Sequence, residues 1–178
     1  MGWTIAMWVV GLLAAAVVLI LIIAATKPDT LRIERSIVIN AAPEAIFPLI
    51  NDFRAWQQWS PWEKKDPDLK RSYSGAASGK GKVYAWEGNK NVGKGRMEII
   101  DSVASRVVID LRFISPFEAN NIAEFTLAPA DGGTAVHWAI YGPKTFIGKV
   151  MGTVMNMDKM IGKDFDQGLA NMKAAAER

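Results

Sequence analysis

The sequence contains no cysteine and only one histidine, His137. The lack of cysteine excludes disulfide bonds, thiolate metal sites and a cysteine nucleophile. With one histidine available, a transition-metal site would need an unusual set of ligands, so we predict no bound metal and no cofactor. His137 lies on the polar side of an alternating segment, which indicates a surface position, and nothing in the sequence supports a Ser-His-Asp triad.

Phosphate-binding and nucleic-acid-binding patterns are also missing. The two Gly-Lys-Gly sequences at 79–81 and 93–95 have no Walker pattern and do not open a helix. The mixture of lysines and aromatic residues around Trp86 is too sparse to indicate nucleic-acid binding. The net charge of +3 is uneven, because residues 64–96 hold nine Lys or Arg and three Asp or Glu, and the rest hold twelve and fifteen. These basic residues are either solvated hairpin ends or a basic lobe that faces anionic headgroups.

Charged side chains are absent from the first 26 residues, and Lys27 is the first ionisable side chain. Residues 3–25 are mostly large and apolar with no polar face. As a helix they would extend roughly 34 Å, slightly more than the ~30 Å hydrocarbon core of a bilayer. A cleavable signal peptide has a basic start and about 7–15 apolar residues, and this segment has neither property. We therefore predict that residues 1–27 are an uncleaved transmembrane signal anchor.

The charges that follow the anchor predict its orientation. Lys27, Arg32 and Arg35 come after the span, whereas nothing basic precedes it. The positive-inside bias then places the remainder of the chain, residues 28–178, in the cytoplasm. These roughly 150 residues are enough for one domain of ordinary size, so we expect a single-pass membrane protein with one globular domain.

Alternating apolar and polar residues, separated by glycine-rich turns, predict an antiparallel sheet in the globular part. A strand at 31–40 is followed by a helix that Pro43 opens. Further strands are predicted at 70–74, 82–87, 95–103, 106–114, 120–128 and 134–141. The alternation places apolar side chains on one face of the sheet and polar ones on the other. From about 145 to 177 the period becomes helical, and this long C-terminal helix is the natural cover for the apolar face.

Short motifs over residues 31–177 carry a resemblance to a known superfamily. They are Arg35-Ser36 with Ala42-Pro43-Glu44 and Phe47; Trp56 with Trp59-Ser60-Pro61-Trp62; Asp66-Pro67; Trp86 with Gly88 and Gly93-Lys94-Gly95; Phe125-Thr126-Leu127 with Gly132-Gly133-Thr134 and Val136-His137-Trp138; and Met157-Asp158 with Ile161-Gly162, Asp164-Phe165 and Gly168-Leu169. With these motifs the chain resembles the START/Bet v 1-like superfamily, also called SRPBCC or polyketide cyclase/dehydrase-like proteins.

The resemblance implies an α+β helix-grip fold, in which a curved antiparallel sheet wraps around a long C-terminal helix. Here that fold would be preceded by one transmembrane helix. The resemblance also implies a deep cavity between sheet and helix that holds apolar or aromatic small molecules. It does not select a function, because the superfamily includes lipid carriers, steroid binders, cyclases and co-chaperones.

One carboxylate interrupts the apolar stripe of the predicted C-terminal helix. Steps of three and four residues give Met151, Val154, Asp158, Ile161, Phe165, Leu169, Met172 and Ala176. Asp158 is either a cavity-facing acid or base, a polar anchor for a ligand, a structural partner, or a residue that reaches solvent. Arg35, in phase with Ile33 and Ile37, is the candidate partner. A buried Arg35–Asp158 pair would be structural, whereas a pair reachable from the cavity would bind a carboxylate or phosphate.

Aromatic and flexible side chains supply the other candidate ligand contacts. Indole rings in the Trp59–Trp62 segment either line the mouth of the cavity or plug the end of the sheet. Methionines of the C-terminal helix either shape an adaptable binding surface or fill the core, and its glycines give space. The predicted ligand-binding set is Arg35, Trp59, Trp62, Tyr84, Trp86, Trp138, Met155, Asp158 and Ile161.

The anchor, the implied cavity and the missing catalytic set favour one function. We expect membrane-tethered binding or transfer of a hydrophobic small molecule or lipid, with the membrane and that ligand as partners and no nucleic acid. One alternative is a polyketide cyclase/dehydratase-like enzyme that uses Asp158 as its acid/base. A second alternative is a protein-interaction module that binds a partner through its surface.

Overall fold

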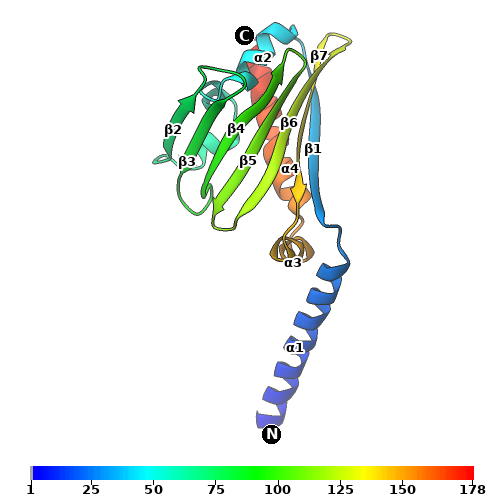
Figure 1. Cartoon of the computed structure of the whole chain (residues 1–178). Helices are drawn as coiled ribbons and strands as arrows, with labels where there is room; N and C mark the ends of the chain where they lie inside the picture. Colours follow the sequence, from blue (N-terminus) through cyan, green and yellow to red (C-terminus); the bar gives the residue numbers. More distant parts are fainter. Residues whose placement is uncertain (1) are drawn as a thin grey trace.

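The computed structural model describes residues 2–178, and it consists of one long N-terminal helix and an α+β domain (Figure 1). Helix α1 (Gly2–Thr26) projects away from the domain. Its apolar part, Trp3–Thr26, contains an 18-residue stretch with a mean hydropathy of 3.0 and is long enough to cross a membrane, although a signal sequence has the same character. Almost all of the side chains of Trp3–Thr26 are exposed, and the exceptions are Ile20, which is half-buried, and Ala24, which is fully buried.

The domain is built on a seven-stranded antiparallel sheet in the order β1-β7-β6-β5-β4-β3-β2. From β2 onward each strand pairs with the next one in the sequence, and β1 joins the sheet beside β7. The strands are β1 (Thr30–Ile39), β2 (Lys70–Gly75), β3 (Lys82–Glu87), β4 (Lys94–Val103), β5 (Arg106–Ser115), β6 (Ala119–Ala130) and β7 (Gly133–Pro143). The α+β helix-grip arrangement is therefore confirmed.

The predicted faces of the sheet are confirmed by burial. Val107 and Ile109 of β5 are fully buried, whereas Arg106 and Arg112 of the same strand point to the other side and reach solvent. Alternation of this kind arises because successive side chains of a strand point to opposite faces. Burial of the apolar face against helices is the main force that holds the domain together.

The helices cover the apolar face and close its ends. Between β1 and β2 lie α2 (Pro43–Asn51) and two short 3₁₀ helices, η1 (Ala55–Gln58) and η2 (Pro61–Lys64). After β7 come α3 (Phe146–Val154) and α4 (Met157–Ala176). Helix α4 packs along β1, and α3 packs against α1 (Figure 1).

The prediction of one continuous C-terminal helix was wrong, because the chain breaks at Met155 and Asn156. Met155 adopts an extended conformation, with φ −121° and ψ 137°. The side chain of Asn156 then accepts a hydrogen bond of 2.9 Å from the backbone N–H of Lys159 and so caps the start of α4. Met151 and Val154 therefore belong to a separate helix and do not continue the stripe that contains Phe165.

The strand register assigns every loop to one of two ends of the domain. Thr30 pairs with Pro143, and Lys94 pairs with Ser115, so the β3–β4 loop, the β5–β6 loop and the start of α3 lie at the end that joins α1. We call this the α1 end. The opposite end, the α2 end, holds α2 and the β6–β7 turn (Figure 1).

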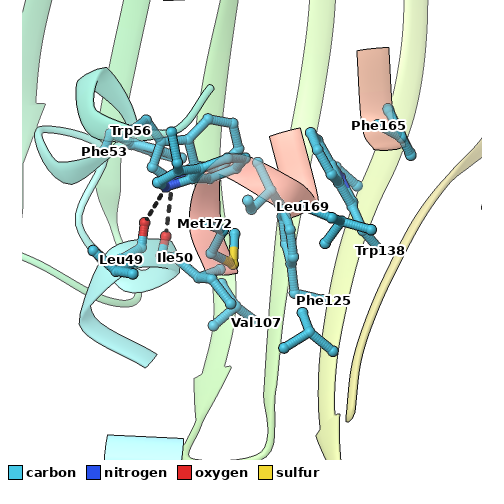
Figure 2. Close-up of a cluster of buried hydrophobic side chains, with 14 of the residues drawn as sticks. Leu49, Ile50, Phe53, Trp56, Val107, Phe125, Trp138, Phe165, Leu169 and Met172 are labelled. Atoms are coloured by element: carbon cyan, nitrogen blue, oxygen red, sulfur yellow. Dashed lines mark hydrogen bonds between the residues drawn. The ribbon is translucent and has the colours of Figure 1, made fainter. Parts of the chain in front are cut away.

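The α2 half of the domain is a filled aromatic core. Phe53 and Phe125 are fully buried there with Leu169 and Met172 of α4 (Figure 2). Trp59 is fully buried in the same core. The indole N–H of Trp56 donates to the carbonyl of Ile50 at 3.0 Å, and that of Trp59 donates to Leu49 at 2.8 Å. Both tryptophans thereby hold the end of α2 against the sheet while their ring atoms stay dry.

Candidate functional site

A cavity of about 530 Å³ lies between the sheet and α4 in the α1 half of the domain. On β5, Leu111 and Phe113 line the cavity, whereas Val107 and Ile109, nearer the α2 end, belong to the filled core. On the other elements, too, the cavity-lining residues lie nearer the α1 end. They are Asn121 and Ala123 on β6, Trp138 and Ile140 on β7, and Met157, Met160, Ile161 and Phe165 on α4. The cavity therefore opens toward the α1 end.

Aromatic rings form much of the cavity wall. Trp138 of β7 and Phe165 of α4 stack with ring centroids 3.9 Å apart and an interplanar angle of 5°. Across the sheet, Tyr84 and Trp86 of β3 stack at 5.9 Å. The indole N–H of Trp138 is the one buried side-chain nitrogen or oxygen in residues 2–178 that makes no hydrogen bond. The interior therefore offers flat apolar surfaces with few polar atoms, which suits a hydrophobic ligand.

A small polar cluster lies in the wall beside these rings. The Glu63 carboxylate, whose side chain is 5% exposed, accepts hydrogen bonds of 2.6 Å from the Tyr84 hydroxyl and from Nε of Arg71. Burial, together with the bond to Glu63, raises the pKa of the Tyr84 hydroxyl, so Tyr84 stays protonated at neutral pH. The single hydroxyl proton of Tyr84 is donated to Glu63, so toward a ligand this hydroxyl is a hydrogen-bond acceptor and not a base.

The mouth of the cavity lies between α4 and the loops of the α1 end. Nζ of Lys65 and a carboxylate oxygen of Asp164 are 2.5 Å apart at this mouth. The indole N–H of Trp86 donates to the carbonyl of Val92 at 3.0 Å, which fixes the β3–β4 loop beside the opening. Gly95 is required there, because a Cβ at this position would collide with the Trp86 ring.

Within residues 2–178 there is no group of three or more His, Asp or Glu side chains that could hold a metal ion. The polar groups of the cavity include the Glu63–Tyr84 pair, the amide of Asn121 and the ion pair at the mouth, and Ser60, Lys90, Asn91 and Ser115 also line it. Such an arrangement can enclose an apolar molecule and orient one polar group on it.

Comparison with known proteins identifies the family. A family model described as "Polyketide cyclase / dehydrase and lipid transport" matches residues 30–177, the whole globular domain. The chain belongs to this family. Its predicted resemblance to SRPBCC proteins is thereby confirmed. No curated protein matches the chain.

Solved structures show that the fold is shared with diverse proteins. A protein from Chromobacterium violaceum has 19% identity and a TM-score of 0.58, over 85% of this chain and 99% of its own. The Aha1 dimer from Colwellia psychrerythraea has 16% identity and a TM-score of 0.54, over 83% and 96%. The di-domain ARO/CYC BexL from the BE-7585A biosynthetic pathway has 12% identity and a TM-score of 0.62, over 88% of this chain and 53% of its own. At these identities the likeness extends to the fold alone.

Five of the predicted ligand-binding residues line the cavity of this polyketide cyclase/dehydrase family member. They are Trp62, Tyr84, Trp86, Trp138 and Ile161. They come from η2, β3, β7 and α4, which the fold brings together around one space. The other four, Arg35, Trp59, Met155 and Asp158, lie outside the lining.

Arg35 and Asp158 pair on the outer surface beside α4. Nη1 and Nη2 of Arg35 each donate to one carboxylate oxygen of Asp158 at 3.1 Å, and Asp158 is 62% exposed. The hydrogen bonds from Arg35 hold the pKa of the Asp158 carboxyl below its usual range. Gly162 leaves room for this pair, because a Cβ there would collide with the guanidinium. Asp158 leaves the sheet-facing stripe because it lies in the first turn of α4, just after the break.

Trp59 and Met155 lie in opposite surroundings. Trp59 is fully buried in the core of the α2 half, so it fills that end of the sheet rather than the mouth. Met155 is 41% exposed at the joint between α3 and α4. The sequence does not distinguish Trp59 from Trp62, because both lie in an irregular segment with no period to assign a face.

Sequence reasoning missed the polar part of the cavity. Glu63 and Lys65 lie in the same irregular segment as the tryptophans, where a charged residue gives no sign of being turned inward. Asn121 was detectable, since it alternates in phase with Ala123 and Phe125 and is 6% exposed. A polar residue on the buried face of a strand is the signal that marks it.

Proposed function

We propose that this protein binds or carries a hydrophobic small molecule or lipid in its cavity, and that α1 tethers it to a membrane. The observation that carries the proposal is the largely apolar cavity of about 530 Å³, which lies within the usual range for ligand sites, about 300–1,000 Å³. The family description, which includes lipid transport, supports the same reading.

The proposed membrane anchor is the second part of this function. Residues 1–27 would serve as the membrane anchor and residues 28–178 as the ligand-binding domain. The basic residues Lys27, Arg32 and Arg35, which follow α1, favour a cytoplasmic position for the domain. A cavity held beside a bilayer samples molecules that dissolve in lipid and are scarce in water.

We assign ligand contact to the aromatic wall. Trp62, Trp86 and Trp138 would stack against the apolar body of the ligand. Tyr84 and Asn121 would serve its polar group, since both carry hydrogen-bonding atoms on the lining. Asp158, the acid/base of the enzymatic alternative, is exposed and bound to Arg35, so a ligand in the cavity would not contact it. For this reason binding is preferred over catalysis.

A cavity-filling variant tests the proposal. The full-length protein is purified in detergent, and its bound molecules are extracted and identified by mass spectrometry. Binding of NBD-labelled dodecanoic acid is measured in parallel. Ala123→Phe places a ring in the cavity and is expected to abolish probe binding and empty the protein of co-purified ligand.

The matched control is Ala128→Phe, the same change on the exposed face of the same strand, which is expected to bind normally. If the unaltered protein carries no lipid-like molecule and binds neither this probe nor a panel of lipids, the proposed function is wrong. Equal binding by Ala123→Phe and the unaltered chain would place the ligand outside the cavity.

A further inference from the structure

Exposed apolar side chains gather at the α1 end of the domain. Eight large hydrophobic residues there are exposed, namely Ile114, Phe117, Phe146, Ile147, Met151, Val154, Met155 and Met160. Outside α1 and this group, the large hydrophobics exposed in residues 2–178 are Val38, Ile100 and Val103. Contiguous apolar surface of this kind marks an interaction site, whereas single exposed residues do not.

Helix α3 contributes an unpartnered apolar stripe to this group. Ile147, Met151 and Val154 recur at steps of four and three, so they share one side of the helix. Ile147 is 56% exposed and Val154 is 67% exposed. The charged residue of α3, Lys149, is turned away from solvent and forms an ion pair with Asp29.

Contacts with the end of α1 fix the position of α3. Asp29 holds Lys149 through its carboxylate, and its carbonyl accepts a 2.7 Å hydrogen bond from the backbone N–H of Lys144. Nζ of Lys27 donates to the carbonyl of Gly152 at 2.7 Å. Ala24, in the last turns of α1, is fully buried where α1 packs against α3. Helix α3 therefore lies at the level where α1 ends.

The mouth of the cavity lies within the same surface. Pro116 lines the cavity, and the next residue, Phe117, is 57% exposed. Met160 both lines the cavity and is 48% exposed. A molecule that leaves the cavity through this mouth therefore passes between the exposed apolar side chains.

We propose that these eight residues form a lipid-docking surface that seats the mouth of the cavity on the bilayer. The inference rests on the proposed anchoring by α1. If α1 spans the bilayer, the packing of Ala24 against α3 brings α3 to the boundary between headgroups and acyl chains. An apolar helix face is stable at that boundary, as in interfacial amphipathic helices. The bilayer is therefore the occupant, and the ligand passes between bilayer and cavity without crossing water.

Fluorescence quenching by lipid tests the docking directly. Because the chain has no native cysteine, Phe117→Cys and Ile147→Cys each give one labelling site. The full chain, labelled with NBD and reconstituted in vesicles that contain brominated phosphatidylcholine, is expected to be quenched at both positions. Asp131→Cys, at the α2 end, is the control that should not be quenched, and Leu12→Cys in α1 reports whether the anchor is inserted.

The outcomes separate the docking surface from the anchor. If Leu12→Cys is quenched and Phe117→Cys and Ile147→Cys are not, the docking surface is wrong while the anchor stands. If Leu12→Cys is not quenched, the anchor fails, and the docking surface fails with it. Labels at 117 and 147 that report an apolar environment without quenching by lipid would show that protein covers the surface, which also overturns the proposal.

A transfer experiment links the surface to function. The double variant Phe117→Ser/Ile147→Ser is expected to take up NBD-labelled dodecanoic acid from vesicles about tenfold more slowly, because two apolar side chains no longer enter the bilayer. Its affinity for the probe in detergent should be unchanged. Val38→Ser/Val103→Ser removes two exposed apolar side chains at the α2 end and should transfer normally. Equal rates for the two double variants would overturn the docking role.

Discussion

The α2 half and the α1 half of the domain are built from the same strands and the same helix, yet one half is full and the other is hollow. In the α2 half, Trp59 and Phe125 are fully buried and fill the space under the sheet. In the α1 half, Phe113 and Trp86 stand around an open space. Burial in the α2 half therefore stabilises the domain, so the α1 half can keep a cavity without being tightly packed.

The largest effect is expected from paired phenylalanine truncations in the two halves. Phe125→Ala should lower the free energy of unfolding by about 3–5 kcal/mol, because it leaves a void in a packed core. Phe113→Ala, at the edge of an existing cavity, should lower the free energy of unfolding by about 1 kcal/mol. Denaturant unfolding of the purified full chain, followed by tryptophan fluorescence, measures both. Similar losses for the two variants would remove the distinction between the halves.

An intermediate effect is expected at Glu63, where the filled and hollow halves meet. Glu63→Gln keeps the shape of the side chain but removes the charge that Arg71 and Tyr84 contact. In denaturant unfolding, this variant should lower the free energy of unfolding by about 1–3 kcal/mol. Glu87→Gln is the matched control, because its pair with Lys94 is exposed and should contribute no measurable stability. A neutral Glu63→Gln variant would show that the cluster does not brace the cavity wall.

The smallest effect is expected at Asp158, whose pair with Arg35 lies on the surface of the hollow half. Because folding lowers the pKa of Asp158, the pair stabilises the protein above the pKa of an unfolded aspartate, about 3.9, and this contribution is lost as the pH falls through the folded value. Asp158→Asn should therefore unfold almost like the unaltered protein at neutral pH and differ less from it in acid. Loss of an enzymatic turnover with folding intact would instead support the cyclase/dehydratase alternative.

Much of the fold was predictable from the sequence because alternation and burial reinforce each other in a one-sided sheet. The faces of β5, β6 and β7 follow from Val107, Phe125 and Trp138 and their neighbours. The break between α3 and α4 was missed, because neither Met155 nor Asn156 interrupts a helix as strongly as proline does. Asn156 was the available signal, since asparagine favours the residue before a helix.

The site was less predictable than the fold. Trp62, Tyr84, Trp86 and Trp138 were found because large aromatic residues belong to the interior of a sheet fold. Whether an interior residue lines a cavity or fills a core depends on how far along the sheet it lies, and that distance is set by pairing between strands. Glu63 was not predicted as a site residue for a different reason. Its burial depends on contacts with Arg71 and Tyr84, which are remote in sequence.

The pairing of β1 with β7 has a consequence for synthesis of the chain. Thr30 lies soon after α1, but its partner Pro143 is made only after most of the domain has been synthesised. Contacts this distant in sequence form slowly, because a long loop must close first. The first strand must therefore remain unpaired until the last strand has been made. The sheet closes at that moment, and only then can α4 cover it.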